Sequence, residues 1–535
     1  MTLCACQNEE PLVLDEGQII NELHAKSIGN LVFMGDFIPY EDFSEKDFVK
    51  ELTITVGGNF HVRMFLEKTL TYYLHELEPE LPVRELCDKG NFQLTFLVDN
   101  QEIYKYNLQT GAGSCEYKNS ATVYGIPLSD SAESDHWGRF LWTRFLKQEG
   151  GEEALSNGSH LLTIEVRPYI QSTQLKVGAI IAQGKVDLSI VEEDVSSELT
   201  AIQQIEPTDK WTLSDAAYDT VLIQALNKKI AQNYFKSITS IVVLKDGKLL
   251  IEEYFNGADR ASLHDTRSVG KTLASTLMGM AIGDQYILDE RRTLSDFYKV
   301  DAYDHYSVEK GNVSLKSLLT MSSGIKGSDI DPDSPGNEEN MYPTKDWVKF
   351  ALDLPMDPEK QSGQDWEYFS AGAVLLGDIL NKTVPSGLET YAEEKLFQPL
   401  GITDYTWQFT PTHVPNTAGG FQMNSLDNAR YIQLYMNDGV YQGKQIVPKS
   451  WVDASMTKHV SIPDRENEFY GYLLWNKSFM VEDKPIEAFY ASGNGGNKLM
   501  ICKDLGIVIV LTSTAYGQPY MHIQAEEIIQ DYVLP

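Results

Sequence analysis

The chain has few basic residues for its size and no long hydrophobic run. Its 535 residues include 44 Lys and Arg against 77 Asp and Glu, a formal net charge of −33 at pH 7. A strongly acidic surface repels phosphate backbones and anionic lipid headgroups, so we expect neither nucleic acid nor a bare membrane surface as a partner. No run of about 18 apolar residues occurs, which argues against a membrane-spanning helix.

Cysteine is scarce as well: the five cysteines are Cys4, Cys6, Cys87, Cys115 and Cys502. None of them has metal-ligand spacing with histidines nearby, so we expect neither a metal ion nor another cofactor. Cys87 and Cys115 fall in one predicted domain. They could form a disulfide if the protein is exported; two free buried thiols are the alternative.

The first residues carry a targeting pattern. Leu3-Cys4-Ala5-Cys6 resembles the end of a bacterial lipoprotein signal, in which the last cysteine is lipidated, and polar, acidic residues follow it. We therefore expect residues 1–25 to be a tether, lipidated on Cys6, that holds the protein in the bacterial cell envelope, periplasmic or outer-membrane associated. In that case the membrane is contacted only through the lipid. The alternative is a cytoplasmic protein in which the resemblance is accidental.

The length predicts two or more domains. Alternating apolar residues at 52–56, 92–98 and 161–166 predict strands, and residues 62–77 read as a helix between them. Residues 26–195 thus form a predicted β-rich, sandwich-like accessory domain, which we match to no family. The polar, acidic residues 196–210 follow as a predicted linker.

The remainder, residues 211–535, predicts an α+β domain. Two apolar runs at 240–244 and 249–255 flank an Asp-Gly turn, as in a β-hairpin. Further strands are expected at 498–502 and 506–512, and mostly helical sequence fills 288–400. Strands at both ends of this segment suggest one antiparallel sheet assembled from the two ends, with helices packed over it.

One stretch of this domain has the pattern of an activated nucleophile. Ser268 opens an apolar helix, and Lys271 lies three residues later on the same helix face. Apolar residues at helical spacing, Val269, Leu273 and Leu277, predict that the opposite face is buried. A lysine held beside a core can lose part of its proton affinity and act as a base, which would activate the serine.

Ser-x-x-Lys by itself is a weak signal, because it also occurs at Ser307, Ser323 and Ser455. Ser307 lies in a charged, loop-like stretch. Ser323 is followed by glycines that suit a turn, and Ser455 lies near the end of a predicted surface helix. Only Ser268 opens a long apolar helix.

Several segments in order resemble landmarks of a known family. They are the hairpin followed by Ser268-Val269-Gly270-Lys271, the helix and loop at 313–325, Tyr368-Phe369-Ser370, and the segments 397–402 and 418–421. In this order they resemble the serine β-lactamase and penicillin-binding-protein superfamily, in the branch with class C β-lactamases, D-amino-acid peptidases, esterases and 6-aminohexanoate-dimer hydrolases. The resemblance implies a β-lactamase/transpeptidase-like fold for about three fifths of the chain.

The resemblance also implies a role for each matched residue. Ser268 attacks a carbonyl carbon, Lys271 takes the serine proton, and Tyr368 helps to move that proton to the leaving group. Backbone N–H groups of Ser268 and Asn494 hold the oxyanion. For Ser370, polar support of Lys271 and a plain loop serine remain open alternatives.

The third family motif differs in this sequence. Where many members have Lys-Thr-Gly or a histidine version of it, this chain has Ala491-Ser492-Gly493. Gly493 keeps the close backbone approach that the oxyanion strand requires, and Ser492 and Gly493 stay candidate substrate-binding positions. Ala491 removes a cation that would bind a substrate carboxylate, so we expect weak or no β-lactam turnover.

Two functions therefore remain in view. The first is an exported serine hydrolase that forms an acyl-enzyme with a small ester, amide or peptide substrate. The alternative is a surface binding protein that keeps the fold but has poor turnover. The sequence gives no oligomeric state.

Overall fold

A computed structural model describes residues 12–36, 38–55, 60–110, 112–127, 141–148, 150–156, 158–191, 193–206, 211–518 and 520–535. The chain divides into two compact units. The N-terminal unit comprises Met1–Val195, with Gln232–Tyr234 and Gln518–Tyr520. The C-terminal unit comprises Ser196–Ala231, Phe235–Gly517 and Met521–Pro535. Each unit is described by itself.

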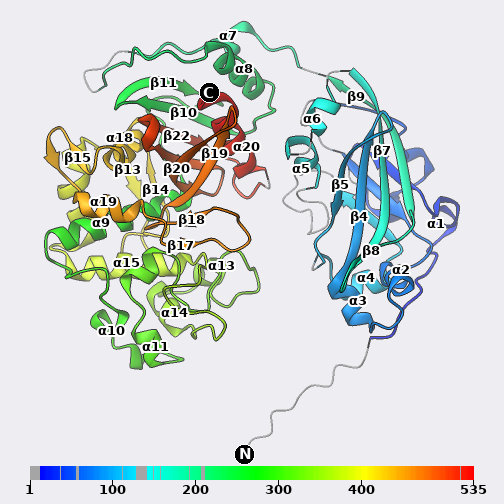
Figure 1. Cartoon of the computed structure of the whole chain (residues 1–535), viewed down its shortest axis with the longest axis horizontal. Helices are drawn as coiled ribbons and strands as arrows, with labels where there is room; N and C mark the ends of the chain where they lie inside the picture. Colours follow the sequence, from blue (N-terminus) through cyan, green and yellow to red (C-terminus); the bar gives the residue numbers. More distant parts are fainter. Residues whose placement is uncertain are drawn as a thin grey trace, which may run out of the picture. The chain divides into compact units, whose positions relative to one another are not determined.

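The N-terminal unit is β-rich, as expected (Figure 1). Its larger sheet has the order β2-β9-β7-β4-β5, with β8 paired to β7; the bounds are β2 (Glu51–Thr55), β9 (Ala182–Val191), β7 (Gly158–Gln171), β4 (Gly90–Val98), β5 (Gln101–Asn107) and β8 (Leu175–Val177). Buried and exposed residues alternate along most of β9, so one face of that strand packs on the core. A smaller sheet has the order β1 (Leu31–Met34), β3 (His61–Phe65) and β6 (Val123–Pro127).

Short helices connect these strands: α1 (Glu22–Ser27), α2 (Leu70–Leu77), α3 (Val83–Lys89), α4 (Cys115–Ser120), α5 (Leu141–Gln148) and α6 (Gly151–Ala154). The predicted helix over 62–77 is wrong in its first part. His61–Phe65 forms β3 because it pairs on both sides, with β1 and β6, and Val62 and Met64 are fully buried. The helix starts only after Thr69, whose hydroxyl accepts a hydrogen bond from the Tyr72 N–H.

Cys87 and Cys115 form a disulfide between α3 and the start of α4. The structure thus decides between the two alternatives for these thiols. The remaining cysteine of the described chain, Cys502, is free and buried.

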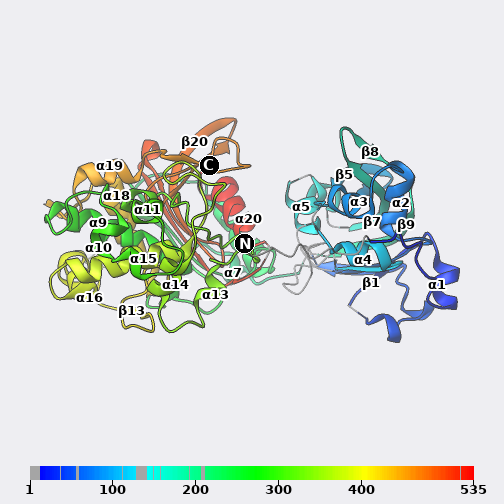
Figure 2. The ribbon, with the colours of Figure 1, turned by 90° about the horizontal axis from the view of Figure 1, so that it is seen from below.

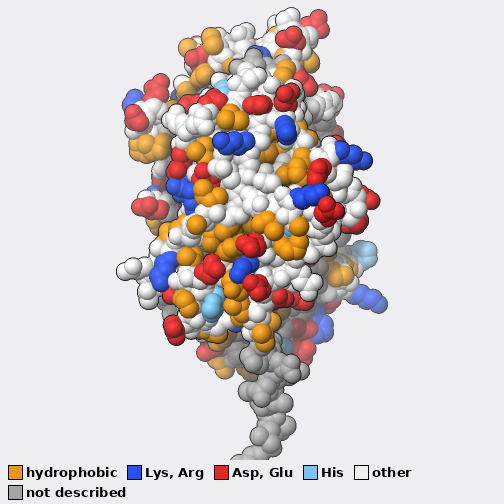
Figure 3. All heavy atoms as spheres, turned by 90° about the vertical axis from the view of Figure 1, so that its right-hand side faces the viewer, with side chains coloured by type: hydrophobic (Ala, Val, Ile, Leu, Met, Phe, Trp, Pro, Cys, Tyr) orange, Lys and Arg blue, Asp and Glu red, His pale blue; other side chains and the backbone are white. Residues whose placement is uncertain are grey.

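The surface of the N-terminal unit is mixed in character. Apolar side chains are exposed near β8, among them Leu175, Val177 and Ile180. Figure 3 draws one face of the molecule, on which hydrophobic, acidic and basic side chains are interspersed. That face therefore presents no large area of a single charge.

The C-terminal unit is built on one antiparallel sheet that both ends of the unit supply, as predicted. Its strand order is β11-β10-β22-β21-β20-β19-β18-β17. The first two strands are β10 (Ile238–Lys245) and β11 (Lys248–Tyr254), and the late ones are β17 (Val460–Ser461), β18 (Phe469–Tyr470), β19 (Trp475–Val481), β20 (Lys484–Gly493), β21 (Asn497–Cys502) and β22 (Ile507–Ser513). Residues 255–459, between these two groups, hold most of the helices.

Helices cover both faces of this sheet, so the central strands β10, β21 and β22 are buried along nearly their whole length. On one face lie α9 (Lys271–Gly283), α15 (Ser370–Thr383) and α18 (Ser425–Met436), and on the other α20 (Met521–Glu527) with α8 (Thr220–Ala231) (Figures 1 and 2). The other helices are α7 (Ser197–Thr200), α10 (Leu294–Phe297), α11 (Val308–Gly311), α12 (Leu315–Leu319), α13 (Glu338–Met341), α14 (Trp347–Asp353), α16 (Gly387–Ala392), α17 (Gln398–Leu400) and α19 (Lys449–Ser455).

Two small sheets complete the unit. One has the order β12 (His264–Asp265), β14 (Phe421–Met423), β13 (Tyr405–Trp407), and the other joins β15 (Val440–Tyr441) to β16 (Lys444–Gln445). The first brings β12, which leads directly to Ser268, beside residues 421–423.

The segment predicted as a linker is bound to the C-terminal unit over residues 196–206. The Gln203 N–H donates to the Glu253 carboxylate at 2.9 Å, and Arg260 Nη2 donates to the Glu206 carbonyl at 3.0 Å. This segment therefore runs along β11 as part of that unit. No helix in the described ranges is long and apolar enough to cross a membrane.

Candidate active site

Ser268 lies at the point where β12 runs into α9. A 3-10 turn, Arg267–Gly270, separates the two elements, and α9 begins at Lys271 rather than at the serine as the sequence suggested. Nearly all of α9 is buried, including the polar side chains of Thr272, Ser275 and Thr276. Ser268 thus lies at the end of a helix that is inside the core.

Glycines allow two other chain segments to approach this turn. A Cβ atom on Gly493, the last residue of β20, would lie 1.9 Å from the Thr266 carbonyl oxygen and 3.2 Å from the Ser268 nitrogen. A Cβ on Gly419 would lie 3.3 Å from the Arg267 carbonyl oxygen. Because only glycine fits at position 493, β20 passes directly beside the backbone of Ser268.

Lys271 is fully enclosed and points at the serine. Its Nζ donates to Ser268 Oγ at 2.7 Å and to the Ala418 carbonyl at 2.8 Å, and the residue is 1% exposed. Ser268 as a whole residue is partly exposed. A buried amine therefore holds the hydroxyl of a residue that is not fully buried.

The other Ser-x-x-Lys sites have ordinary structural roles. Ser307 caps α11, Ser323 accepts a hydrogen bond from the Ile325 N–H, and Ser455 donates to the Trp451 carbonyl. Within residues 211–518, which the structure describes without a gap, Ser268 and Lys271 are the one pair of these four in which the lysine amine donates to the serine hydroxyl; Lys310 reaches Ser307 only through its backbone N–H.

The charge state of Lys271 differs from the sequence-based expectation. Burial on its own would lower the pKa of this amine, but its electrostatic interactions with Tyr368, Glu338 and Asp329 outweigh burial and raise the pKa above its usual value. Lys271 is therefore an ammonium at neutral pH in the free protein. The prediction of a lysine with reduced proton affinity is wrong, because it considered the apolar neighbours along α9 and not these three groups.

Asp329 is the group that sequence reasoning missed. Its two carboxylate oxygens accept hydrogen bonds from the Glu338 N–H at 2.9 Å and the Ser370 N–H at 2.6 Å. Burial, followed by the charge of Glu338, raises the pKa of this carboxyl to about 6, and Lys271 acts in the opposite direction. In the sequence, Asp329 lies in a polar loop between predicted helices, and that position alone does not indicate a function.

The ring of Tyr368 lies beside the lysine. Lys271 Nζ is 5.1 Å from the centroid of this ring. The ring stacks on Trp475 at 5.7 Å between centroids and contacts Trp366 at 6.2 Å. These aromatic neighbours, which the sequence did not single out, fix the plane of the phenol.

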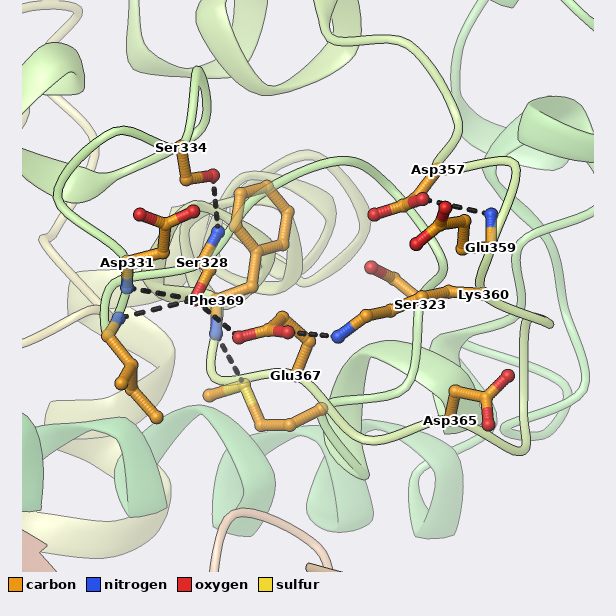
Figure 4. Close-up of polar contacts among 12 residues, drawn as sticks. Ser323, Ser328, Asp331, Ser334, Asp357, Glu359, Lys360, Asp365, Glu367 and Phe369 are labelled. Carbon is orange, nitrogen blue, oxygen red and sulfur yellow. Dashed lines mark hydrogen bonds and ion pairs between the residues drawn. The ribbon is translucent and has the colours of Figure 1, made fainter. Parts of the chain in front are cut away.

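The backbone of Tyr368 is tied down on both sides. Its carbonyl accepts from the Asp329 N–H at 2.9 Å, while the Glu367 N–H donates to the Met321 carbonyl at 2.7 Å. Figure 4 shows that the Glu367 carboxylate lies between Ser328 and Lys360 and is bonded to both. The loop that carries Tyr368 is thus held by hydrogen bonds rather than by a regular element.

The remaining predicted site residues lie around this centre in different ways. Ser370 is fully buried at the start of α15, and its recorded backbone contact goes to Asp329 rather than to Lys271. Asn494 follows Gly493 directly, and its side chain accepts from the Gly517 N–H at 2.7 Å. The Ser492 hydroxyl accepts from the buried Lys498 Nζ at 2.9 Å.

Two further expectations concern groups away from this centre. In the described ranges, no three His, Cys, Asp or Glu side chains lie together in a way that could hold a metal ion. Cys6, the predicted lipidation site, lies outside the described residues.

Comparison with known proteins shows the family of this chain. A family model described as Beta-lactamase matches residues 230–532. The curated "Putative penicillin-binding protein PbpX" of Bacillus subtilis (strain 168) is 23% identical over 238 residues, which are 43% of this chain and 58% of that protein. The chain thus spans under two thirds of that relative's length.

The chain is also similar to several solved structures. One is titled "Putative 6-aminohexanoate-dimer hydrolase from Bacillus anthracis" (18% identity, TM-score 0.47, 64% of this chain and 92% of that chain). Another is a penicillin-binding protein homologue from Pyrococcus abyssi (19% identity, TM-score 0.45, 58% and 76%). Since the family model matches more than half of the chain, this protein belongs to the β-lactamase family of serine hydrolases, with its family domain over residues 230–532.

Proposed function

We propose that this protein hydrolyses a small ester, amide or peptide through an acyl-enzyme on Ser268, with weak or no turnover of β-lactams. The observation that carries the proposal is the 2.7 Å hydrogen bond from the buried Lys271 to the hydroxyl of Ser268, a residue that is partly exposed. A serine held in this way, at a turn that a neighbouring strand approaches, has the geometry of an activated nucleophile.

The Lys271–Tyr368 pair handles the proton in this reaction. Ser268 Oγ bonds to the substrate carbonyl carbon, and the bond from that carbon to the leaving group breaks as the leaving group takes a proton. Lys271 is an ammonium in the free protein, and an ammonium beside a neutral phenol cannot accept a proton. The Lys271–Tyr368 pair can therefore accept the serine proton only after one of its two groups has lost a proton. It then passes that proton to the leaving group, and water later hydrolyses the acyl-enzyme by the same route.

The oxyanion is assigned to two backbone N–H groups, those of Ser268 and Asn494. In support, Gly493 brings β20 to the Ser268 nitrogen, and the Asn494 side chain is engaged by Gly517. Ser492 turns to the opposite face, where Lys498 holds it, so its role is to support the strand rather than to touch substrate.

Weak β-lactam turnover follows from position 491. Ala491 is 1% exposed and packs into the core of the unit, so this position supplies neither a cation nor a polar contact to a substrate carboxylate. Ester, amide or peptide substrates that need no cation there are favoured.

The test is labelling with a fluorophosphonate, followed by intact-mass measurement and peptide mapping. We expect one adduct, on Ser268, which is lost in Ser268→Ala. An adduct that persists in Ser268→Ala, or no adduct, would favour the alternative of a binding protein with poor turnover. Labelled protein then justifies a screen of esters, D-amino-acid amides and β-lactams.

We also propose that the protein is exported and held in the cell envelope by a lipid on Cys6. The Cys87–Cys115 disulfide supports export, because disulfides persist in oxidising compartments. Mass analysis of the mature N-terminus in a bacterial host tests this: a diacylglyceryl-modified cysteine is expected. An unmodified N-terminus in the cytoplasmic fraction would leave the cytoplasmic alternative.

A further inference from the structure

An arginine stands directly before the nucleophile in an unusual backbone conformation. Arg267 has φ of 55°, in the left-handed region that non-glycine residues seldom adopt. Its N–H donates to Asp265 Oδ1 at 3.1 Å, which helps to hold the turn. Residues with a strained backbone are often found at functional sites, so the contacts of the Arg267 side chain matter for function.

Two contacts fix the guanidinium. Its Cζ lies 4.4 Å from the centroid of the Tyr516 ring, and Nε lies 3.4 Å from Asp265 Oδ2. The Tyr516 hydroxyl in turn donates to the Asp265 carbonyl at 2.8 Å. The Arg267 side chain nevertheless remains 47% exposed, so nearly half of its surface is open to a ligand.

Tyr516, whose ring the Arg267 guanidinium lies over, is next to the end of β20. Gly495 and Ala515 form an isolated bridge, and a Cβ on Gly495 would lie 2.9 Å from Tyr516 Cδ1. The next residues bond to the oxyanion segment, since the Gly517 N–H donates to Asn494 Oδ1. Arg267 is thus covalently joined to Ser268 and sits on the ring beside Asn494.

We propose that Arg267 binds a carboxylate of the substrate, so that the enzyme acts on esters or amides that carry a negative charge near the scissile bond. The proposal rests on the proposed function and narrows its substrate class. In a chain with a net charge of −33, a partly open cation beside the nucleophile stands out as an anion contact.

The test compares two fluorophosphonates that are identical except that the alkyl chain ends in a methyl group or in a carboxylate. In both reactions the Ser268 Oγ–phosphorus bond forms, the phosphorus–fluorine bond breaks, fluoride leaves, and the Lys271–Tyr368 pair takes the serine proton. We expect wild type to react faster with the carboxylate probe. In Arg267→Gln the ratio of the two rate constants should fall about 10- to 100-fold, as for loss of one charge-assisted hydrogen bond.

Three variants sharpen the reading. Arg267→Asn should behave like Arg267→Gln, and asparagine tolerates the left-handed conformation, which guards against misfolding. Arg267→Lys should keep part of the preference. Arg292→Gln removes a similarly exposed, ion-paired arginine between α9 and α10 and should leave the ratio unchanged.

The outcomes separate this inference from the function on which it rests. Equal rates for the two probes in wild type, or a ratio that Arg267→Gln and Arg267→Asn leave intact, would overturn the carboxylate assignment alone. If neither probe labels Ser268, the proposed function fails and this inference fails with it. Added salt should weaken the preference in wild type, because the guanidinium is partly exposed.

Discussion

Each unit contains a lysine of equal and nearly complete burial, Lys118 in one and Lys271 in the other, and these two lysines behave in opposite ways. Lys118 in the N-terminal unit and Lys271 in the C-terminal unit are both 1% exposed. Lys118 Nζ donates to three backbone carbonyls, those of Cys87, Gly90 and Thr110. Burial lowers the pKa of Lys118 to about 8, whereas nearby negative charges raise the pKa of Lys271.

The difference lies in the partners rather than in the depth of burial. Neutral carbonyls satisfy the donors of Lys118 and leave no group with which it could exchange a proton. Lys271 instead donates to the hydroxyl of the partly exposed Ser268, and a phenol and two carboxyls interact with its charge. A buried lysine is therefore a catalytic candidate only when a titratable or nucleophilic partner shares its site.

The largest expected effect is that of Lys271→Met on the rate at which Ser268 is labelled. Lys271→Met removes the donor to Ser268 and half of the proton-handling pair, so the rate of fluorophosphonate labelling should fall by about 10³-fold or more. The measurement is the pseudo-first-order labelling rate at pH 7.5. Lys118→Met is the matched control, since it removes an equally buried amine and should change the labelling rate little. Similar losses in both variants would mean that stability, not chemistry, explains the effect.

Sequence reasoning found the part of this site that is local in the chain. The three-residue spacing of Ser268 and Lys271 follows from helix periodicity, and the resemblance to a known family supplied Tyr368. It could not supply Asp329 and Glu338, which lie more than 60 residues after Ser268 and reach Lys271 only through the tertiary fold. The pKa direction of Lys271 was therefore wrong although its position was predicted.

The same limit applies to the fold. Strands at both ends of the C-terminal unit were visible as apolar runs, and they do form one antiparallel sheet. Val62, Met64 and Phe65 are apolar residues that suit a helix as well as a strand, and pairing with two neighbouring strands decided the outcome. The polar, acidic composition of residues 196–206 predicted a linker. Composition does not reveal hydrogen bonds to a distant strand such as β11, which hold this segment on the C-terminal unit.

A smaller effect is expected on the stability of the N-terminal unit in Lys118→Met. The substitution leaves three buried carbonyls without their shared donor, so we expect the free energy of unfolding to fall by about 2–4 kcal/mol. Hydrogen exchange of β4 and β7 peptides in the full chain measures this. Exchange as slow as in wild type would show that the carbonyls find other donors.

The pH dependence of that loss has a defined sign. The folded pKa of Lys118 is about 8, below the value near 10.4 of an unfolded lysine, so the unfolded state binds more protons between these values. Wild type should therefore gain stability relative to Lys118→Met as the pH rises from about 8 to 10. Comparison of the two proteins at equal pH cancels the intrinsic exchange rate.

The smallest expected effect is that of Asp329→Asn on the pH dependence of the labelling rate, which tests whether nearby charges set the pKa of Lys271. Asp329→Asn removes one of the negative charges that raise the pKa of Lys271, so the rise of the labelling rate with pH should occur at lower pH than in wild type. Asp331→Asn, an exposed position in the same loop, is the matched control and should leave the profile in place. An unchanged profile in Asp329→Asn would mean that Glu338 and Tyr368 alone set the charge of Lys271.

The stability of wild type relative to Asp329→Asn should also depend on pH. It should fall as the pH rises, whereas the stability of wild type relative to Lys118→Met should increase. The folded pKa of Asp329 is about 6, above the 3.8 of an ordinary aspartate, so the folded state binds more protons between these values. Wild type should therefore lose stability relative to Asp329→Asn as the pH rises from about 4 to 6, because the buried carboxyl becomes charged. Urea unfolding of both proteins across this range measures the difference. A buried carboxyl that destabilises the fold above pH 6 yet keeps Lys271 charged fits an active site better than a structural ion pair.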